Sequence, residues 1–229
     1  MADVEPLDNP IWHALTGPQA MFSEGTGLAL RFEPEVAVFA ALPDQVAADA
    51  WDALRALVGN GGAIVARPQL EPPPGWRSPF RLDGFQMIAP DSFGRGAPDD
   101  RFVRLTNDDV PEMLALVERT RPGPFAKRTI ELGPYYGLRD DAGELVAMSG
   151  TRMRLPGYAE LSAVCTDPAL RGKGIATALM ETVAAGMRSN GEQPMLHVAE
   201  NNSTAIALYE HLGFVRRSRF TFALVQPPE

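Results

Sequence analysis

Apolar residues on one helical face mark the clearest element of the sequence, between residues 174 and 188. They recur every four positions: Ile175, Leu179, Val183 and Met187. This spacing is typical of an amphipathic α-helix. The segment before it, Arg171–Gly174, reads RGKG and follows a β-compatible run from Glu160 to Thr166. The pattern therefore predicts a strand, a glycine-bearing turn and a helix in direct succession.

Strand-like and helix-like patterns alternate through the rest of residues 101–229. The other expected strands are Phe102–Thr106, Tyr135–Asp140, Glu144–Arg154 and Pro194–Glu200. The second and third of these flank Asp141–Gly143, which is a hairpin signal. Asn107 or Asp108 is expected to cap a helix whose apolar face includes Met113 and Val117. We predict an α/β domain over this part of the chain.

The first hundred residues carry shorter and less regular patterns. Helices are expected at Asn9–Ala20 and Gln45–Val58, and strands at Leu28–Phe32, Val36–Ala40 and Ala63–Ala66. The second helix should end at Gly59, because glycine commonly follows the last helical residue. A proline-rich segment (67–79) and a linker-like segment (90–100) come next, so we place a domain boundary near residue 98. Residues 1–98 are predicted to form a smaller α/β region.

Composition and charge narrow the classes of protein. The 229 residues are 45% hydrophobic and carry a net charge of −8, with 14 acidic and 6 basic residues up to position 100 and 15 of each afterwards. No basic cluster suits nucleic acid, and no stretch is apolar enough to span a bilayer. The single cysteine, Cys165, and three dispersed histidines give no metal-ligand spacing. We expect a soluble, cytoplasmic protein with no metal and no membrane or nucleic-acid partner.

The turn before the helix has the properties of an anion site. The first N–H groups of a helix lack intrahelical acceptors, and the helix dipole is positive at this end. Gly172 and Gly174 would let the backbone approach a phosphate closely, and Arg171 and Lys173 add positive charge. The alternative is an ordinary tight turn between a strand and a helix. Walker A spacing is absent, and Thr177 replaces the third glycine of the dinucleotide-binding pattern.

Two motifs in this half resemble those of the GNAT superfamily of N-acetyltransferases. Residues 171–176 (RGKGIA) match its pattern Q/R-x-x-G-x-G/A, and residues 201–214 (NNSTAIALYEHLGF) contain N-x-x-A-x-x-L-Y-x-x-x-G-F. The resemblance covers residues 101–229. It implies a twisted mixed sheet in which two central parallel strands splay apart, here Leu161–Thr166 and Pro194–Glu200. Residues 1–98 could then be a degenerate copy of the same fold.

The resemblance also implies acetyl-CoA as a cosubstrate, bound between the splayed strands. Its pantetheine arm would meet the main chain of Val164, Cys165 and Thr166. Its pyrophosphate would meet the turn and the first helical residues, which are Arg171, Gly172, Lys173, Gly174, Ile175, Ala176 and Thr177. Asn202, at the start of the next helix, would contact the cofactor, although its alternative role is that of a helix N-cap.

Catalytic roles follow from the resemblance as well. Tyr209 falls where the family places the general acid for the departing thiolate; its alternative role is packing on the helix face. Glu160 resembles the family's glutamate base in position, and its alternative is a solvated carboxylate at a strand end. Ser162 and Thr166 would share its face in the absence of a bulge. His197 is a second candidate base or a hydrogen-bonded strand histidine.

These residues predict an N-acetyltransferase that moves the acetyl group of acetyl-CoA to an amine by direct attack in a ternary complex. The amine would belong to a small molecule or a peptide. Removing a proton from an alkylammonium at pH 7 costs roughly 4–5 kcal/mol, so a base should matter more than an acid. Cys165 is interpreted as a core residue rather than a nucleophile. The alternative function is an inactive CoA-binding sensor; the acceptor, and the choice between monomer and homodimer, stay open.

Overall fold

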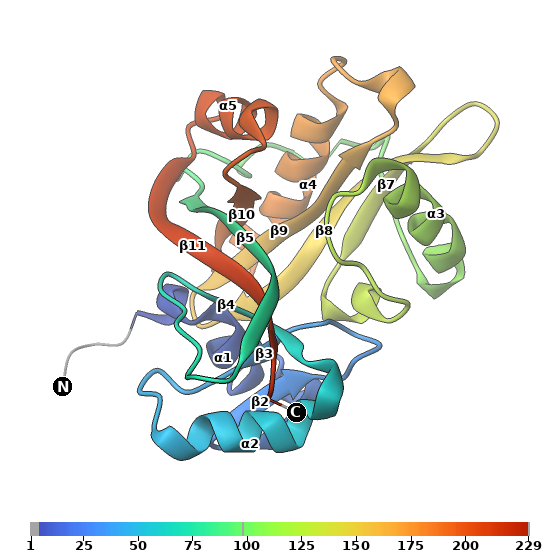
Figure 1. Cartoon of the computed structure of the whole chain (residues 1–229). Helices are drawn as coiled ribbons and strands as arrows, with labels where there is room; N and C mark the ends of the chain where they lie inside the picture. The colour runs from blue at the N-terminus through green and yellow to red at the C-terminus, as the bar shows by residue number, and fades with distance from the viewer. Residues whose placement is uncertain (1–4, 98, 229) are drawn as a thin grey trace. The chain divides into compact units, whose positions relative to one another are not determined.

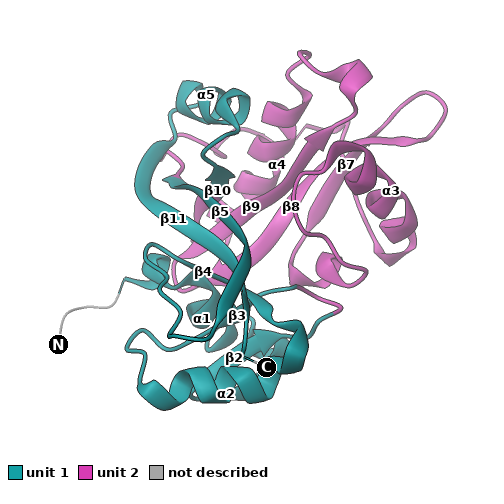
Figure 2. Ribbon diagram, viewed as in Figure 1, with its two compact units in different colours: residues 1–34, 38–87, 197–229 teal, residues 35–37, 88–196 magenta. Residues whose placement is uncertain are grey.

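The protein is described by a computed structural model over residues 5–97 and 99–228. Its contacts divide it into two compact units, which Figure 2 shows in different colours. The first unit holds residues 1–34, 38–87 and 197–229, and the second holds residues 35–37 and 88–196. The division falls after Met87, ahead of the boundary predicted near residue 98, and the end of the chain returns to the first unit.

The second unit is built on four consecutive antiparallel strands (Figure 1). They are β6 (Val103–Arg104), β7 (Tyr135–Arg139), β8 (Leu145–Leu155) and β9 (Tyr158–Thr166). Its helices are α3 (Val110–Thr120) and α4 (Ile175–Ser189). Successive strand residues face opposite sides of a sheet, so Met148 packs with residues of α3 and Ala147 with residues of α4. The predicted hairpin, the strand before the turn and the amphipathic helix are confirmed.

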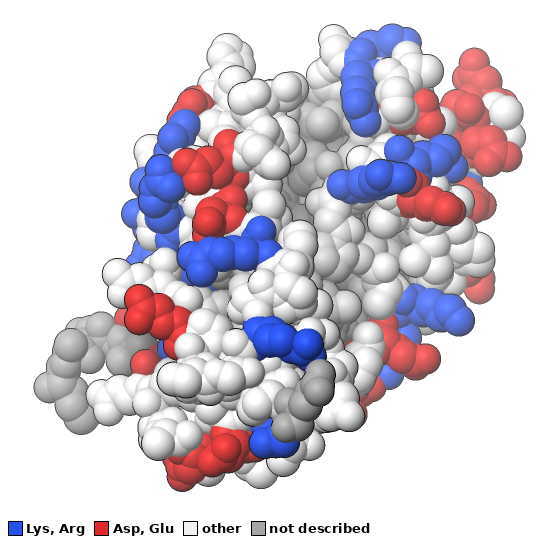
Figure 3. Space-filling view, viewed as in Figure 1, with Lys and Arg blue, Asp and Glu red and all other residues white. Residues whose placement is uncertain are grey.

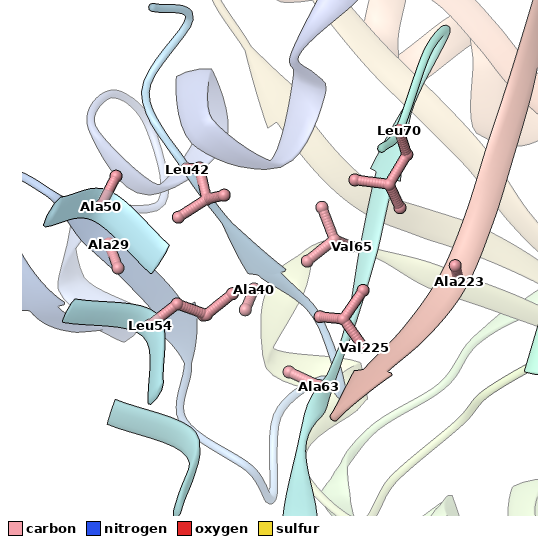
Figure 4. Packing of buried hydrophobic residues seen from close by; sticks show 10 residues of the cluster. All are labelled: Ala29, Ala40, Leu42, Ala50, Leu54, Ala63, Val65, Leu70, Ala223 and Val225. Carbon is pink, nitrogen blue, oxygen red and sulfur yellow. The ribbon is translucent and has the colours of Figure 1, made fainter. Parts of the chain in front are cut away.

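The first unit combines a small sheet with strands of the large one. Its helices are α1 (Pro10–Leu15), α2 (Ala48–Val58) and α5 (Ser203–His211). Its strands are β1 (Ser23–Thr26), β2 (Ala29–Phe32), β3 (Ala40–Ala41), β4 (Ala63–Arg67), most of β5 (Arg77–Ile88) and β11 (Val215–Gln226). Strands β1, β2 and β3 form an antiparallel sheet. Figure 4 shows how Leu54 of α2 packs with Leu42, Val65 and Val225 in the core.

The large sheet has eight strands in the order β4-β11-β5-β10-β9-β8-β7-β6. Strand β10 (Gln193–Ala199) begins in the second unit and ends in the first. It runs parallel to β9, whereas the β8–β9 and β4–β11 pairs are antiparallel. The predicted α/β class with a mixed sheet is confirmed. Within the described residues, no helix is long and apolar enough to cross a membrane.

Several predicted elements differ in length from the observed ones. The first helix ends at Leu15 rather than near Ala20, and the strand expected over Val36–Ala40 is reduced to β3. Strand β5 starts within the proline-rich segment, where its outer residues are exposed and leave no apolar alternation from which a strand could be predicted. Asn107 and Asp108 do not cap α3: they lie in a short 3-10 helix (Asn107–Asp109) that precedes it. Thr106 forms a capping box with Asp109 at the start of that short helix.

Candidate active site

The turn between β9 and α4 has a backbone that favours glycine at two positions. Gly172 has φ +78° and Gly174, the N-cap of α4, has φ +75°. Both values lie in the left-handed region, which residues with a Cβ seldom adopt. No other atom lies within 4 Å of where a Cβ would stand at either position. Glycine is therefore favoured at both positions by the backbone conformation of the turn, and not by a lack of space for a side chain.

The backbone N–H groups of residues 172–177 indicate an anion-binding site. In the part of the chain that the structure describes, none of them has a hydrogen-bond acceptor, and no side chain caps α4. Arg171 and Lys173 are exposed beside them, and Arg171 Nε donates to the carbonyl of Thr166 at 3.2 Å. Unpaired amides, a helix N-terminus and two cations together suit a diphosphate. This arrangement fits the pyrophosphate of a CoA ester.

Strand β9 contains a bulge just before this turn. Ser162 pairs with Gly150 and Cys165 pairs with Met148, so Ala163 and Val164 together face one residue of β8. Ala163 also has φ +50°, which is unusual for a residue with a Cβ. The extra residue reverses the alternation, and Ser162 and Thr166 face opposite sides. A shared face was expected only for a strand without a bulge, and that condition is not met.

The parallel pairing of β9 with β10 is short. Its register runs from Tyr158 with Gln193 to Glu160 with Met195. Beyond this point β9 continues through Val164 and Thr166. This stretch lies beyond the residues of β9 that pair with β10, and it includes the main chain of residues 164–166 that is predicted to contact pantetheine.

Cys165 belongs to the hydrophobic core. It is 7% exposed and packs in a cluster with Met148, Tyr135 and residues of α3. Burial raises the pKa of the Cys165 thiol, which leaves less of the reactive thiolate. The interpretation of Cys165 as a core residue is confirmed.

Glu160 is buried and paired with an arginine. Its side chain is 1% exposed, and Arg152 donates to both of its oxygens, Nε to Oε2 at 2.8 Å and Nη2 to Oε1 at 2.6 Å. The alternative of a solvated carboxylate at a strand end is therefore wrong, because Glu160 lies inside the sheet. Its predicted role as a base is still a prediction.

Asn202 and Tyr209 lie on α5, in the first unit. Asn202 is the N-cap of this helix, and its Oδ1 accepts a hydrogen bond from the N–H of Ala205 at 3.1 Å. Tyr209 is 9% exposed, and its ring packs 5.8 Å from that of Phe214. Burial raises the pKa of Tyr209 to about 12. The capping role of Asn202 and the packing role of Tyr209 are both present; their cofactor and acid roles stay predictions.

His197 takes part in a polar network around Gln86 in the first unit. Gln86 is fully buried, and its Nε2 lies 3.1 Å from His197 Nε2 while donating to the carbonyl of Leu7. Arg217 donates to Gln86 Oε1, which fixes the orientation of the amide. Gln86 therefore donates to His197, and the proton of a neutral imidazole lies on Nδ1. The histidine is hydrogen-bonded, as one of its two interpretations required.

The basic run near the end of the chain is neutralised locally. Arg216 pairs with Glu210, Arg217 with Asp8 and Arg219 with Glu200, at distances of 2.6, 2.8 and 3.0 Å. Figure 3 shows basic and acidic side chains mixed over the face drawn. These arginines therefore form intramolecular ion pairs instead of a free basic surface. Among the described residues, no group of three or more histidine, cysteine or acidic side chains could hold a metal ion.

Sequence reasoning missed Arg152 and Tyr135. Arg152 is the one residue with a full charge between Leu145 and Met153, a span otherwise made of apolar and small residues, and this was the available signal. Its partner could not be deduced, because β8 also contains an irregularity: Thr151 pairs with Leu161 but Arg154 with Ala159. Arg152 and Met153 therefore both lie opposite Glu160. No turn motif in the sequence predicts this register.

Comparisons with known proteins agree with this geometry. The family model described as FR47-like protein matches residues 135–223. A crystal structure of a protein of the GNAT family from Novosphingobium aromaticivorans is 40% identical, with a TM-score of 0.88 over 99% of this chain and 100% of that one. A GCN5-related N-acetyltransferase from Kribbella flavida, at 13% identity and TM-score 0.63, covers 93% of both chains and shares the fold. The chain belongs to the GNAT superfamily.

Curated relatives give a more specific name. A mycothiol acetyltransferase from Salinispora tropica is 38% identical over 165 residues, which are 66% of this chain and 50% of that protein. Another from Amycolatopsis mediterranei is 30% identical over 154 residues, again 50% of its length. The chain spans half or less of the curated relatives it matches.

Proposed function

We propose that this protein transfers the acetyl group of acetyl-CoA to the nitrogen of an amine. The observation that carries the proposal is the run of N–H groups at residues 172–177 that have no acceptor among the described residues, in a chain that belongs to an acetyltransferase superfamily. A hydrogen bond to a charged acceptor contributes about 1.5–3 kcal/mol, so a few of these amides would supply most of a micromolar affinity. Arg171 and Lys173 would add to the attraction.

The rest of the donor would lie along β9. The main chain of Val164, Cys165 and Thr166 follows the short parallel register with β10, which supports its assignment to the pantetheine arm. The bulge at Ala163 re-aims this stretch, and bulges are common beside active sites. Asn202 would contact the donor through atoms that its capping bond leaves unused. When bound, the thioester supplies the activated acetyl group.

Tyr209 is proposed as the group that assists the departing sulfur. Because burial raises the pKa of Tyr209 to about 12, its hydroxyl keeps its proton at neutral pH. A thiol has a pKa of about 8.5, so complete proton transfer from Tyr209 to a thiolate would be uphill by roughly 5 kcal/mol. We therefore assign to Tyr209 a hydrogen bond donated to the sulfur, and not a completed transfer.

The acceptor is an amine of a small molecule or peptide in this proposal. Because the curated relatives are named mycothiol acetyltransferases, mycothiol-related amines are the first acceptors to try. A cytoplasmic location belongs to the same proposal, since the one thiol is free and acetyl-CoA is the donor. An inactive CoA sensor has no observation in its favour here.

The experiment has two stages. Isothermal titration with CoA should give a saturable heat with a micromolar Kd, and a panel of amines with acetyl-CoA should release thiol for at least one amine. Absence of CoA binding at millimolar concentration would overturn the proposal. Tight CoA binding with no amine accepted would instead identify a sensor.

A further inference from the structure

Glu160 is already engaged in an ion pair with Arg152, which is not the arrangement expected of a general base. The arginine side chain is 11% exposed and the glutamate 1% exposed, and two hydrogen bonds join them in a fork. Protonating Glu160 would leave Arg152 as a buried cation with a neutral partner. Buried charges without a partner are strongly unfavourable, so this carboxylate is a poor place for a proton.

The surroundings of the pair favour its charged form. Burial lowers the pKa of Arg152 and its bond to Glu160 raises it, and the net result lies above the ordinary value. The other titratable groups that influence this face are Tyr135 of β7 and Cys165 of β9, and burial raises the pKa of both, so they stay neutral. On β10, Glu160 is opposed by the apolar Met195.

The fold places the pair at one irregularity of the sheet and close to a second. At the first, Arg152 and Met153 of β8 face Glu160 together; at the second, Ala163 and Val164 of β9 face a single residue. The segment between them leads directly to the main chain assigned to the donor. Tyr135 covers the same face, since a Cβ at Gly150 would collide with its ring. The ion pair thus ties β8 to β9 at the irregularity of β8, a few residues before the bulge of β9.

We propose that Arg152 and Glu160 are positioning residues: the pair fixes the bulged course of β9 and takes no proton from the acceptor. This inference rests on the proposed function. It implies that the acceptor reacts as a neutral amine. The amine nitrogen then forms a bond to the acetyl carbon, and the carbon–sulfur bond breaks with its electron pair left on sulfur. Nitrogen then loses one proton to water, and the thiolate that Tyr209 hydrogen-bonds takes one proton from water, so the step balances.

The test compares Arg152→Met and Glu160→Leu with the double variant that combines them. Each single change deprives a buried charge of the partner it has in the fork, and we expect the Tm to fall by roughly 10 °C and turnover to fall with it. The double variant buries no charge, so it should recover the Tm to within a few degrees and turnover to within about tenfold. The matched control is Arg154→Met with Glu192→Leu, a half-buried pair joined at 2.8 Å whose arginine also lies on β8 and whose glutamate precedes β10.

The outcomes separate the two roles. A folded double variant that binds CoA normally but has lost more than about 100-fold in turnover would make Glu160 a proton acceptor and overturn the proposal. Should the double variant not fold, the unmodified protein decides: the rising limb of kcat/KM with pH should follow the pKa of each of two accepted amines. A limb that is the same for both amines would contradict the proposal. Failure of the proposed function differs, because the unmodified protein would then acetylate nothing.

Discussion

Two glycines with the same backbone angle give a matched test of the proposed phosphate site. Gly174 and Gly191 both have φ +75°, and both have open space where a Cβ would stand. Gly174 begins α4, whereas Gly191 follows the end of this helix. Alanine at either position is strained by about 1–2 kcal/mol. We therefore expect Gly174→Ala and Gly191→Ala to lower the Tm by similar amounts, about 2–8 °C.

Binding of CoA should distinguish the two variants. Alanine at position 174 relaxes the backbone and moves the amides of the turn, so at least one hydrogen bond to the diphosphate is lost. That loss of about 1.5–3 kcal/mol weakens the affinity by roughly 10- to 150-fold. Gly191→Ala should bind CoA as tightly as the unmodified protein. The assays are isothermal titration and thermal unfolding; equal CoA affinities of the two variants would refute the reasoning.

Three further predictions concern the two buried tyrosines. Tyr209→Phe should reduce kcat about three- to tenfold and leave the Kd of CoA unchanged, because the hydroxyl donates a hydrogen bond without giving up its proton; unchanged kcat in rapid-mixing assays would remove it from the mechanism. Tyr135→Phe should raise the free energy of unfolding by about 1 kcal/mol in urea titrations, because the buried hydroxyl has no partner among the described residues; a loss of stability would contradict this. Burial raises the pKa of Tyr209 to about 12, above its unfolded value, so stability present below pH 10 should be lost as the pH rises from 10 to 12. That loss should be smaller in Tyr209→Phe, and an equal loss would disprove the assignment.

Local sequence signals predicted those parts of the fold that depend on local physics. The four-residue apolar period of α4 and the glycines before it follow from helix geometry and from the positive φ of Gly174, and both are observed. Gly59, with φ +56°, ends α2 for the same reason. These features need no knowledge of the rest of the chain, and the glycine-bearing turn before α4 was therefore predictable.

Features that depend on strand register were not predictable. The partner of Arg152 is set by the irregularity in β8, and the face of Thr166 by the bulge at Ala163. Each shifts the alternation by one residue, and one residue is enough to reverse which side chains face the core. Packing between neighbouring strands determines where such shifts occur, so the alternation of apolar and polar residues within one strand does not predict them. The burial of Glu160 was missed for the same reason.

A crystal structure of the protein grown with CoA tests the central claim most directly. The account predicts diphosphate oxygens about 3 Å from several N–H groups of residues 172–177. Coenzyme bound elsewhere on the molecule, with these N–H groups left to solvent, would contradict it.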